Sequence, residues 1–181
     1  SDTIPIKTLD FSYDKAGNLM TYDDGATSAT YTYDDANRKL SETVNYGNFE
    51  LTYSYSYYKN GLKNSLTMPD GTRYDYIYDN NNQISMISVP GQGTMTFNKY
   101  KWSMPETITF PGGTHRDNTY DPLMQLKSLT VKGPSQNQLM SYNYEYSPIG
   151  NVTAKNTEQG NYAYQYDELY RLTGAINPTA S

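Results

Sequence analysis

The chain has 181 residues, a formal net charge of −5 and no cysteine. A disulfide framework and a thiolate metal site are therefore excluded, and the acidic balance argues against nucleic acid as a partner. No stretch approaches the roughly 18 apolar residues of a membrane helix, and the first residues lack the features of a secretion signal. We expect any targeting signal to lie outside this sequence.

Aromatic composition is strongly biased. The sequence holds 21 tyrosines against four phenylalanines and one tryptophan. Tyrosine favours strands and is half apolar and half polar, which suits a sheet whose faces stay partly wet. The composition predicts β structure with a modest dry interior.

A Tyr-Asp pair followed by a turn recurs along the chain. The full copies begin at Tyr13-Asp14, Tyr33-Asp34, Tyr78-Asp79, Tyr120-Asp121 and Tyr166-Asp167, and weaker copies begin at Tyr57, Tyr100 and Tyr146. Neighbouring anchor tyrosines are 20 to 26 residues apart. Self-similarity at a nearly fixed period indicates a tandem array of one supersecondary unit, about eight copies long.

Each copy has the pattern of a β-hairpin. Residues before the anchor alternate, as in Tyr142-Asn143-Tyr144-Glu145-Tyr146, which is the period of a strand. The aspartate suits the first position of a type I turn, where its carboxylate accepts backbone N–H groups. The fourth position favours positive φ and is occupied by Gly17, Asn37 and Asn82 in three copies.

Three copies depart from this rule, at Met104, Met124 and Tyr170, and we expect their turns to differ in geometry. Outgoing strands open on a branched apolar residue, and Pro-Gly-rich return turns such as residues 69–72 and 111–114 follow them. Two strands per copy give about sixteen strands. The predicted fold is all-β, with tandem antiparallel hairpins forming one long, curved, open sheet.

None of the acidic residues is marked as chemically special. Asp14, Asp34, Asp79, Asp121 and Asp167 hold the same turn position, so capping explains them better than a shared cation. The single histidine, His115, is interpreted as a surface residue, since a zinc site or a catalytic triad needs more partners. We predict no catalytic residue, no metal site and no cofactor.

The tyrosines admit two interpretations. Cross-strand aromatic pairs could form ladders that hold a thin sheet together, and this is the favoured one. Exposed tyrosines also stack on sugar rings, and the densest group, Tyr53, Tyr55, Tyr57 and Tyr58, is the candidate ligand patch. Trp102 is interpreted as local packing.

The repeat also resembles a known family. The pattern Tyr-Asp-x-x-Gly-x-Leu at residues 13–19, with Pro-Asp-Gly-Thr-Arg-Tyr at residues 69–74 between copies, resembles the YD repeats of bacterial Rhs proteins. Similar repeats occur in toxin-complex B and C subunits, wall-associated proteins and animal teneurins. The resemblance implies a spiralling strip of sheet that forms a hollow shell around a C-terminal toxin, which a separate aspartyl-protease-like domain releases.

The sequence holds no candidate for that protease-like domain. We therefore expect residues 1–181 to be one YD array taken from a longer one, with a non-enzymatic, structural role in a secreted or cell-surface bacterial protein. Its partners would be a protein cargo and the rest of the shell, and its open edges could associate with each other. A carbohydrate- or cell-surface-binding module is the alternative, and an enzyme with an unrecognised site is a third.

Overall fold

The computed structural model describes residues 8–178, which form strands and turns and contain no helix. The strands are β1 (Asp10–Tyr13), β2 (Leu19–Asp23), β3 (Ser28–Tyr33), β4 (Lys39–Asn45), β5 (Glu50–Tyr57), β6 (Lys63–Thr67), β7 (Arg73–Tyr78), β8 (Ile84–Val89), β9 (Gly93–Lys101), β10 (Met104–Thr109), β11 (His115–Tyr120), β12 (Leu126–Lys132), β13 (Gln138–Tyr146), β14 (Val152–Thr157), β15 (Gly160–Tyr166) and β16 (Leu172–Ile176).

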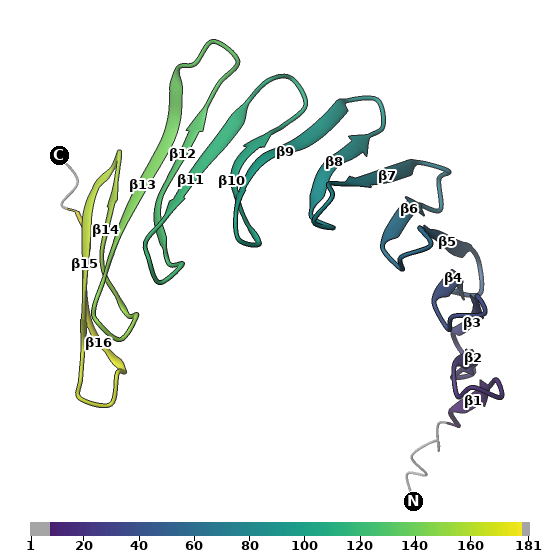
Figure 1. Cartoon of the computed structure of the whole chain (residues 1–181). Coiled ribbons are helices and arrows are strands. Elements are labelled where there is room, and N and C mark those ends of the chain that lie inside the picture. Colours follow the sequence, from purple (N-terminus) through teal and green to yellow (C-terminus); the bar gives the residue numbers. More distant parts are fainter. Residues whose placement is uncertain (1–7, 179–181) are drawn as a thin grey trace, which may run out of the picture. The chain divides into compact units, whose positions relative to one another are not determined.

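The strand order is the chain order. Across the described residues, β1 to β16 follow one another in a single antiparallel sheet, and no strand crosses over another (Figure 1). The predicted all-β fold of tandem hairpins and the predicted sixteen strands are confirmed. The residues expected to open outgoing strands do so: Leu19, Ile84, Leu126, Val152 and Leu172 begin β2, β8, β12, β14 and β16.

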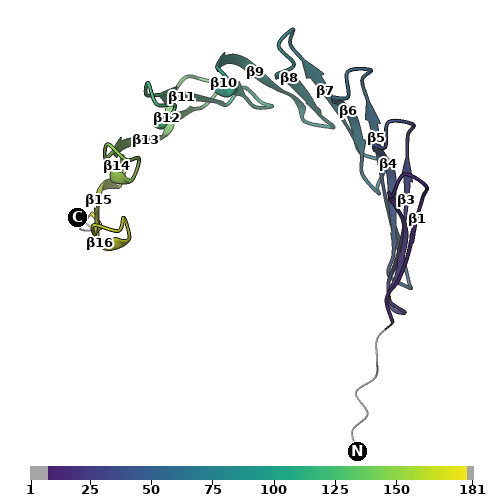
Figure 2. The same cartoon turned by 60° about the horizontal axis from the view of Figure 1, so that its bottom comes forward.

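Two compact units divide the chain. The first holds β1 to β7, the second holds β9 to β16, and β8 is shared between them. The ribbon of each unit is a single layer of sheet (Figure 2). Because neither sheet segment is covered by a second layer, burial is sparse. In the described part of the chain, the buried hydrophobic residues are Ala29, at 4% exposure, and Ile108, at 5%.

The two faces of the sheet differ in chemistry. Strand pairing places Ser12 opposite Thr21, and their hydroxyl oxygens lie 2.6 Å apart. Equivalent hydroxyl pairs join Thr32 to Ser41, Thr43 to Thr52, Ser56 to Ser65, and Thr119 to Ser128. Because side chains alternate along a strand, the tyrosines occupy the opposite face. We call the two surfaces the hydroxyl face and the tyrosine face.

Candidate functional site

The repeated Tyr-Asp turns are the feature that the sequence singles out, and they share one construction. At the first turn the Gly17 N–H donates to the Asp14 carbonyl at 3.1 Å, and the Asp14 N–H donates to the Asn18 carbonyl at 2.9 Å. Gly17 has φ of +87°, and the strand register shifts at Tyr13. This is a type I turn closed by a one-residue bulge whose first residue is left-handed.

Each aspartate caps its own turn. The Asp14 Oδ1 accepts hydrogen bonds from the N–H groups of Ala16 at 2.9 Å and Asn18 at 2.8 Å. The same pair of acceptor contacts recurs at Asp34, Asp79, Asp121 and Asp167. The positions of all five carboxylates therefore agree with the interpretation that each aspartate caps its turn.

These contacts favour the charged carboxylate. The hydrogen bond from the Asn18 side chain lowers the pKa of Asp14, and the hydrogen bond from the Arg38 side chain lowers the pKa of Asp34. At Asp167 the backbone N–H of Arg171 makes the largest contribution to lowering the pKa. The Arg38 and Arg171 guanidinium groups also form ion pairs with these last two carboxylates, at 2.6 and 2.7 Å.

Acidification is expected to destabilise the fold. The unfolded aspartates take up protons near pH 4, whereas the folded ones stay charged to lower pH. Their contribution to the free energy of unfolding is thus complete above about pH 4 and is lost as the pH falls through the lowered folded values. Urea unfolding from pH 7 to pH 2 measures this.

Two aspartates of one turn provide the control. Asp34→Ala should lower the urea midpoint at pH 7 and flatten the acid dependence, because the cap is already gone. Asp35→Ala, at the exposed neighbouring position, should change neither. An acid dependence of full size in Asp34→Ala would contradict the capping role.

We expected the turns at Met104, Met124 and Tyr170 to differ in geometry from the other turns. This expectation is wrong for two of the three. Met124 and Tyr170 adopt φ of 65° and 63°, and their N–H groups donate to Asp121 and Asp167 as Gly17 does to Asp14. The cap and the bulge thus impose the left-handed conformation on residues that disfavour it. The turn before Met104 does differ: β9 and β10 are joined by the two residues Trp102 and Ser103, and Trp102 has φ of 57°.

Relief of this conformation should stabilise the protein. Tyr170 is exposed, so Tyr170→Gly removes left-handed strain without removing buried contacts, and should raise the free energy of unfolding by about 0.5–1 kcal/mol. Gly17→Ala should lower it by about 1 kcal/mol, since a Cβ there meets no atom within 4 Å and only the strain counts. Tyr170→Ala keeps the left-handed strain and is the control. Thermal melting should show no increase in its melting temperature.

The anchor tyrosines have a partner that sequence patterns do not reveal. The Tyr33 hydroxyl donates to the Leu19 carbonyl at 2.9 Å, across to the strand that leaves the preceding Tyr-Asp turn. The same bond runs from Tyr57 to Lys39, Tyr100 to Ile84, Tyr120 to Pro105, Tyr146 to Leu126, and Tyr166 to Val152. Each of these six anchors therefore fastens one repeat to the one before it.

Other polar side chains link successive turns along the same edge. The Asn18 amide donates to Asn37 at 2.8 Å, and the Arg38 guanidinium donates to the Tyr58 carbonyl at 3.1 Å. In the second unit the Lys101 ammonium donates to the carbonyls of Tyr120 and Asp121. A residue at the start or end of one turn thus reaches the next turn, 19 or 20 residues further along the chain.

The predicted ladders of paired tyrosines do not form. Among the strand tyrosines, Tyr22 alone lies on an even-numbered strand, and it pairs with Phe11, with ring centroids 5.6 Å apart. The others lie on odd-numbered strands, so antiparallel neighbours place other residue types opposite them, as with Tyr55 and Leu66. A lysine on the strand between often fills the gap: the Lys155 ammonium lies 5.3 Å from the Tyr142 ring and 4.7 Å from the Tyr162 ring. Cation–π contacts thus bridge tyrosines on strands that are two apart, roughly 9.6 Å. At the turn edge Tyr58 and Tyr78 also meet directly, edge to face, with ring centroids 6.0 Å apart.

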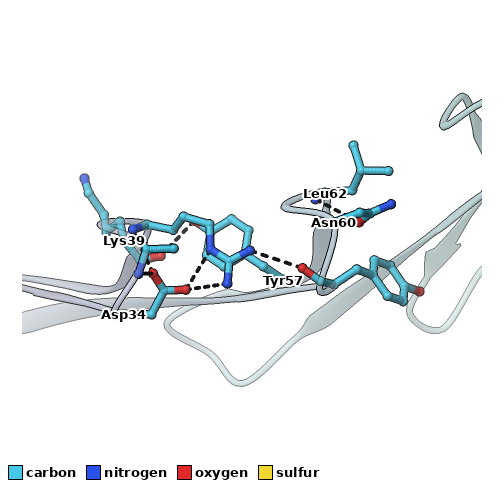
Figure 3. Close-up of polar contacts among 8 residues, drawn as sticks. Asp34, Lys39, Tyr57, Asn60 and Leu62 are labelled. Carbon is cyan, nitrogen blue, oxygen red and sulfur yellow. Dashed lines mark hydrogen bonds and ion pairs between the residues drawn. The ribbon is translucent and has the colours of Figure 1, made fainter.

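The candidate ligand patch is largely engaged in contacts of its own. Tyr53, Tyr55 and Tyr57 lie half-buried on the tyrosine face of β5, and Tyr58 follows in the turn. The Tyr57 hydroxyl donates to the Lys39 carbonyl beside the Asp34 turn (Figure 3). Its ring lies 4.7 Å from the Arg38 guanidinium, and partial burial raises the pKa of Tyr55. The Tyr58 hydroxyl donates to the Tyr76 carbonyl at 2.9 Å.

Two interpretations of single residues are wrong. Trp102 is not local packing, because its side chain is 82% exposed at the tip of its turn. His115 is not a surface side chain: it opens β11, is 15% exposed, and its Nε2 lies 3.7 Å from the Asp117 carboxylate. The burial of His115 depends on strand register, whereas the exposure of Trp102 follows from its place in the turn between β9 and β10.

Shallow grooves run beside the turns, one of them lined by Asp14, Thr32 and Asp34 among others. Within residues 8–178 there is no group of three histidine, cysteine or acidic side chains spaced to hold a metal ion. The same range includes no helix long and apolar enough to span a bilayer.

Comparison with known proteins identifies this array of turns. The family profile described as the teneurin YD-shell matches residues 2–177. The chain belongs to the teneurin YD-shell family. Among curated proteins, none matches the YD-shell sequence.

Solved structures share the fold of this YD-shell chain. The crystal structure of TcdB2-TccC3-Cdc42 matches with a TM-score of 0.80 at 17% identity, over 97% of this chain and 11% of that one. A Photorhabdus luminescens Tc holotoxin pore with a mutation in TccC3 matches with a TM-score of 0.80 at 16% identity, over 96% and 10%. The YD-shell segment therefore spans about a tenth of the length of these chains.

Proposed function

We propose that this YD-shell segment is a non-enzymatic piece of a container wall that helps to enclose a protein cargo, such as a C-terminal toxin. The observation that carries the proposal is the sequential strand order with no covering layer. A sheet in which every strand pairs only with its chain neighbours can be lengthened by further hairpins without rerouting the chain. Such a sheet is suited to forming a wall.

The contacts of the repeat support the same role. The aspartates cap turns and the anchor tyrosine hydroxyls fasten neighbouring repeats, so both motif residues are used for architecture. The structural likeness to Tc toxin chains agrees with a secreted or cell-surface protein in which the wall continues beyond these residues.

Protease protection in the natural protein tests the proposal. We expect a segment C-terminal to the YD array to resist protease in the intact protein and to become cleavable when residues 126–146, one hairpin of the wall, are deleted. Replacing the Pro-Ser pair at residues 134–135 within that hairpin serves as the control and should leave protection intact. Equal cleavage of the downstream segment in the intact and deleted proteins would contradict the proposal.

The carbohydrate-binding alternative remains a prediction. A glycan array probed with the chain, and with Tyr53→Ala and Tyr55→Ala variants, tests it directly. Binding that these variants abolish would support a ligand patch on the tyrosine face.

A further inference from the structure

The tyrosine face of the second unit carries only positive charge on its strands β11 to β16. The acidic residues of these strands are Asp117 and Glu145, and the register places both on the hydroxyl face, opposite Thr130 and Ala154. The charged residues that the same strands place on the tyrosine face are Arg116, Lys127 and Lys155. A chain with a net charge of −5 thus presents one local surface that attracts anions.

These cations have no carboxylate partner among residues 8–178, unlike Lys39 of the first unit, which pairs with Glu42 at 2.8 Å. Arg116 is half-buried, and its Nε is buried without a hydrogen-bond acceptor. Asn118, two residues further along the same face, is 5% exposed, and its Oδ1 is buried without a donor. A partly desolvated cation without a counter-charge is stabilised by an anion that comes from outside.

Lysine and tyrosine alternate in a row across this face. The register places Tyr144 opposite Lys155, and Lys155 opposite Tyr162. Continuation of the pairing between β12 and β13 brings Lys127 beside Tyr144, and both line one shallow groove. We call these four residues the lysine–tyrosine row. The Lys155 ammonium lies 4.7 Å from the Tyr162 ring, which holds it in place, and Lys127 is exposed.

Two acidic residues border the groove without neutralising the row. Asp121 and Glu145 line it together with Lys127. The Asp121 carboxylate accepts the N–H groups of Leu123 and Gln125, and Glu145 alternates onto the hydroxyl face. Within the described part of the chain, neither carboxylate forms an ion pair with Lys127. Both lysines of the row therefore keep their charge free for a ligand.

We propose that the lysine–tyrosine row binds an acidic polypeptide segment in the polyproline II conformation. Its two lysines are two strands apart, roughly 9.6 Å. A polyproline II helix has three residues per turn and a rise of about 3.1 Å, so acidic side chains three residues apart lie on one side of it, roughly 9.3 Å from each other. Each of them then meets one lysine, while the Tyr144 ring between the lysines packs on a proline.

The surroundings of the row favour such a segment over a compact ligand. The sheet is a single layer here, and the groove at Lys127 is shallow, so an extended chain can lie across the strands. The unpaired Arg116 on β11 offers a further contact for a carboxylate of the same segment. The inference is independent of the shell role, because the binding is a property of this face of the chain and is measured on the chain itself.

Fluorescence anisotropy of a labelled peptide made of Glu-Pro-Pro units tests the proposal. We expect the chain to bind it, and the affinity to fall as salt is added. A Gln-Pro-Pro peptide keeps the conformation without the charge and should bind at least about tenfold more weakly. Lys127→Gln combined with Lys155→Gln should weaken binding of the acidic peptide by at least about fivefold. Lys15→Gln combined with Lys59→Gln removes the same charge from exposed turns of the first unit and should change it by less than about twofold.

Four results would overturn the proposal. They are a dissociation constant above about 1 mM for the acidic peptide, equal binding of the two peptides, equal losses in the two double variants, and tighter binding of a heparin fragment than of the peptide. The last would assign the row to a sulphated glycan. Circular dichroism shows whether each variant keeps its sheet, and the comparison of the two peptides on the unmodified chain requires no variant.

Discussion

Tyr146→Phe is expected to lower the free energy of unfolding by about 1 kcal/mol, because it removes the hydroxyl that donates to the Leu126 carbonyl at 2.8 Å. Tyr146→Ala should lower it by about 2–3 kcal/mol, since the half-buried ring is lost as well. If the hydroxyl bond fastens one repeat to the one before it, the two variants separate the contribution of the bond from that of the ring.

The matched control is Tyr13, which holds the same position in its repeat but is 61% exposed. Tyr13→Phe should change the urea midpoint by no more than experimental error. A loss in Tyr13→Phe as large as that in Tyr146→Phe would show that the effect belongs to tyrosine in a strand and not to the inter-repeat bond.

High pH gives an independent measure of the same bond. Partial burial raises the pKa of Tyr146, so the folded protein keeps the phenol protonated at a pH where the unfolded chain has lost the proton. The stabilising contribution is complete below about pH 10 and is lost as the pH rises through the folded value. Tyr146→Phe should reduce the loss of stability between pH 9 and pH 12.

Ile108→Ala is expected to lower the free energy of unfolding by about 2–3 kcal/mol. Ile108 is 5% exposed and lies opposite Phe97 and Arg116 on neighbouring strands, so truncation leaves a void in the most buried part of the second unit. We expect a loss in the lower part of the range that is usual for truncating a buried isoleucine to alanine, because a single layer of sheet relaxes more easily around the void than a closed core does.

Ile149→Ala removes the same atoms from an exposed turn tip and should change stability by less than about 0.5 kcal/mol. Urea unfolding followed by circular dichroism compares the two. Equal effects would mean that the burial of Ile108 does not contribute to the stability of the second unit.

The parts of the fold that follow from local spacing could be predicted from the sequence. Alternation around Tyr144 and the turn chemistry at Asp14 and Gly17 act within a few residues, so hairpins, strand number and capping were all accessible. Met124 and Tyr170 were misjudged because the turn geometry prevailed over residue preference. Propensity alone does not show that a cap and a bulge fix φ.

Contacts between strands were less accessible. The bond from Tyr33 to Leu19 and the lysine beside Tyr142 depend on register, which a one-residue bulge shifts at six of the anchors. The same limitation explains His115, whose burial depends on which face the shifted register gives it. The sequence does show tyrosines recurring on every second strand. That the strand between them keeps most of these tyrosines from pairing with one another becomes clear only from the strand order.

The chain-order pairing of the strands also bears on how such a protein is made. Each strand finds its partner in the strand synthesised just before it, so nearly all pairing is local in sequence. A nascent chain could therefore add hairpins one at a time as it leaves the ribosome, with the newest strand as the growing edge. Assembly from the N-terminus onward would leave two unpaired edges at each stage, that of the first strand and that of the newest one, however many repeats the gene encodes. The surface open to aggregation would therefore not grow with the number of repeats.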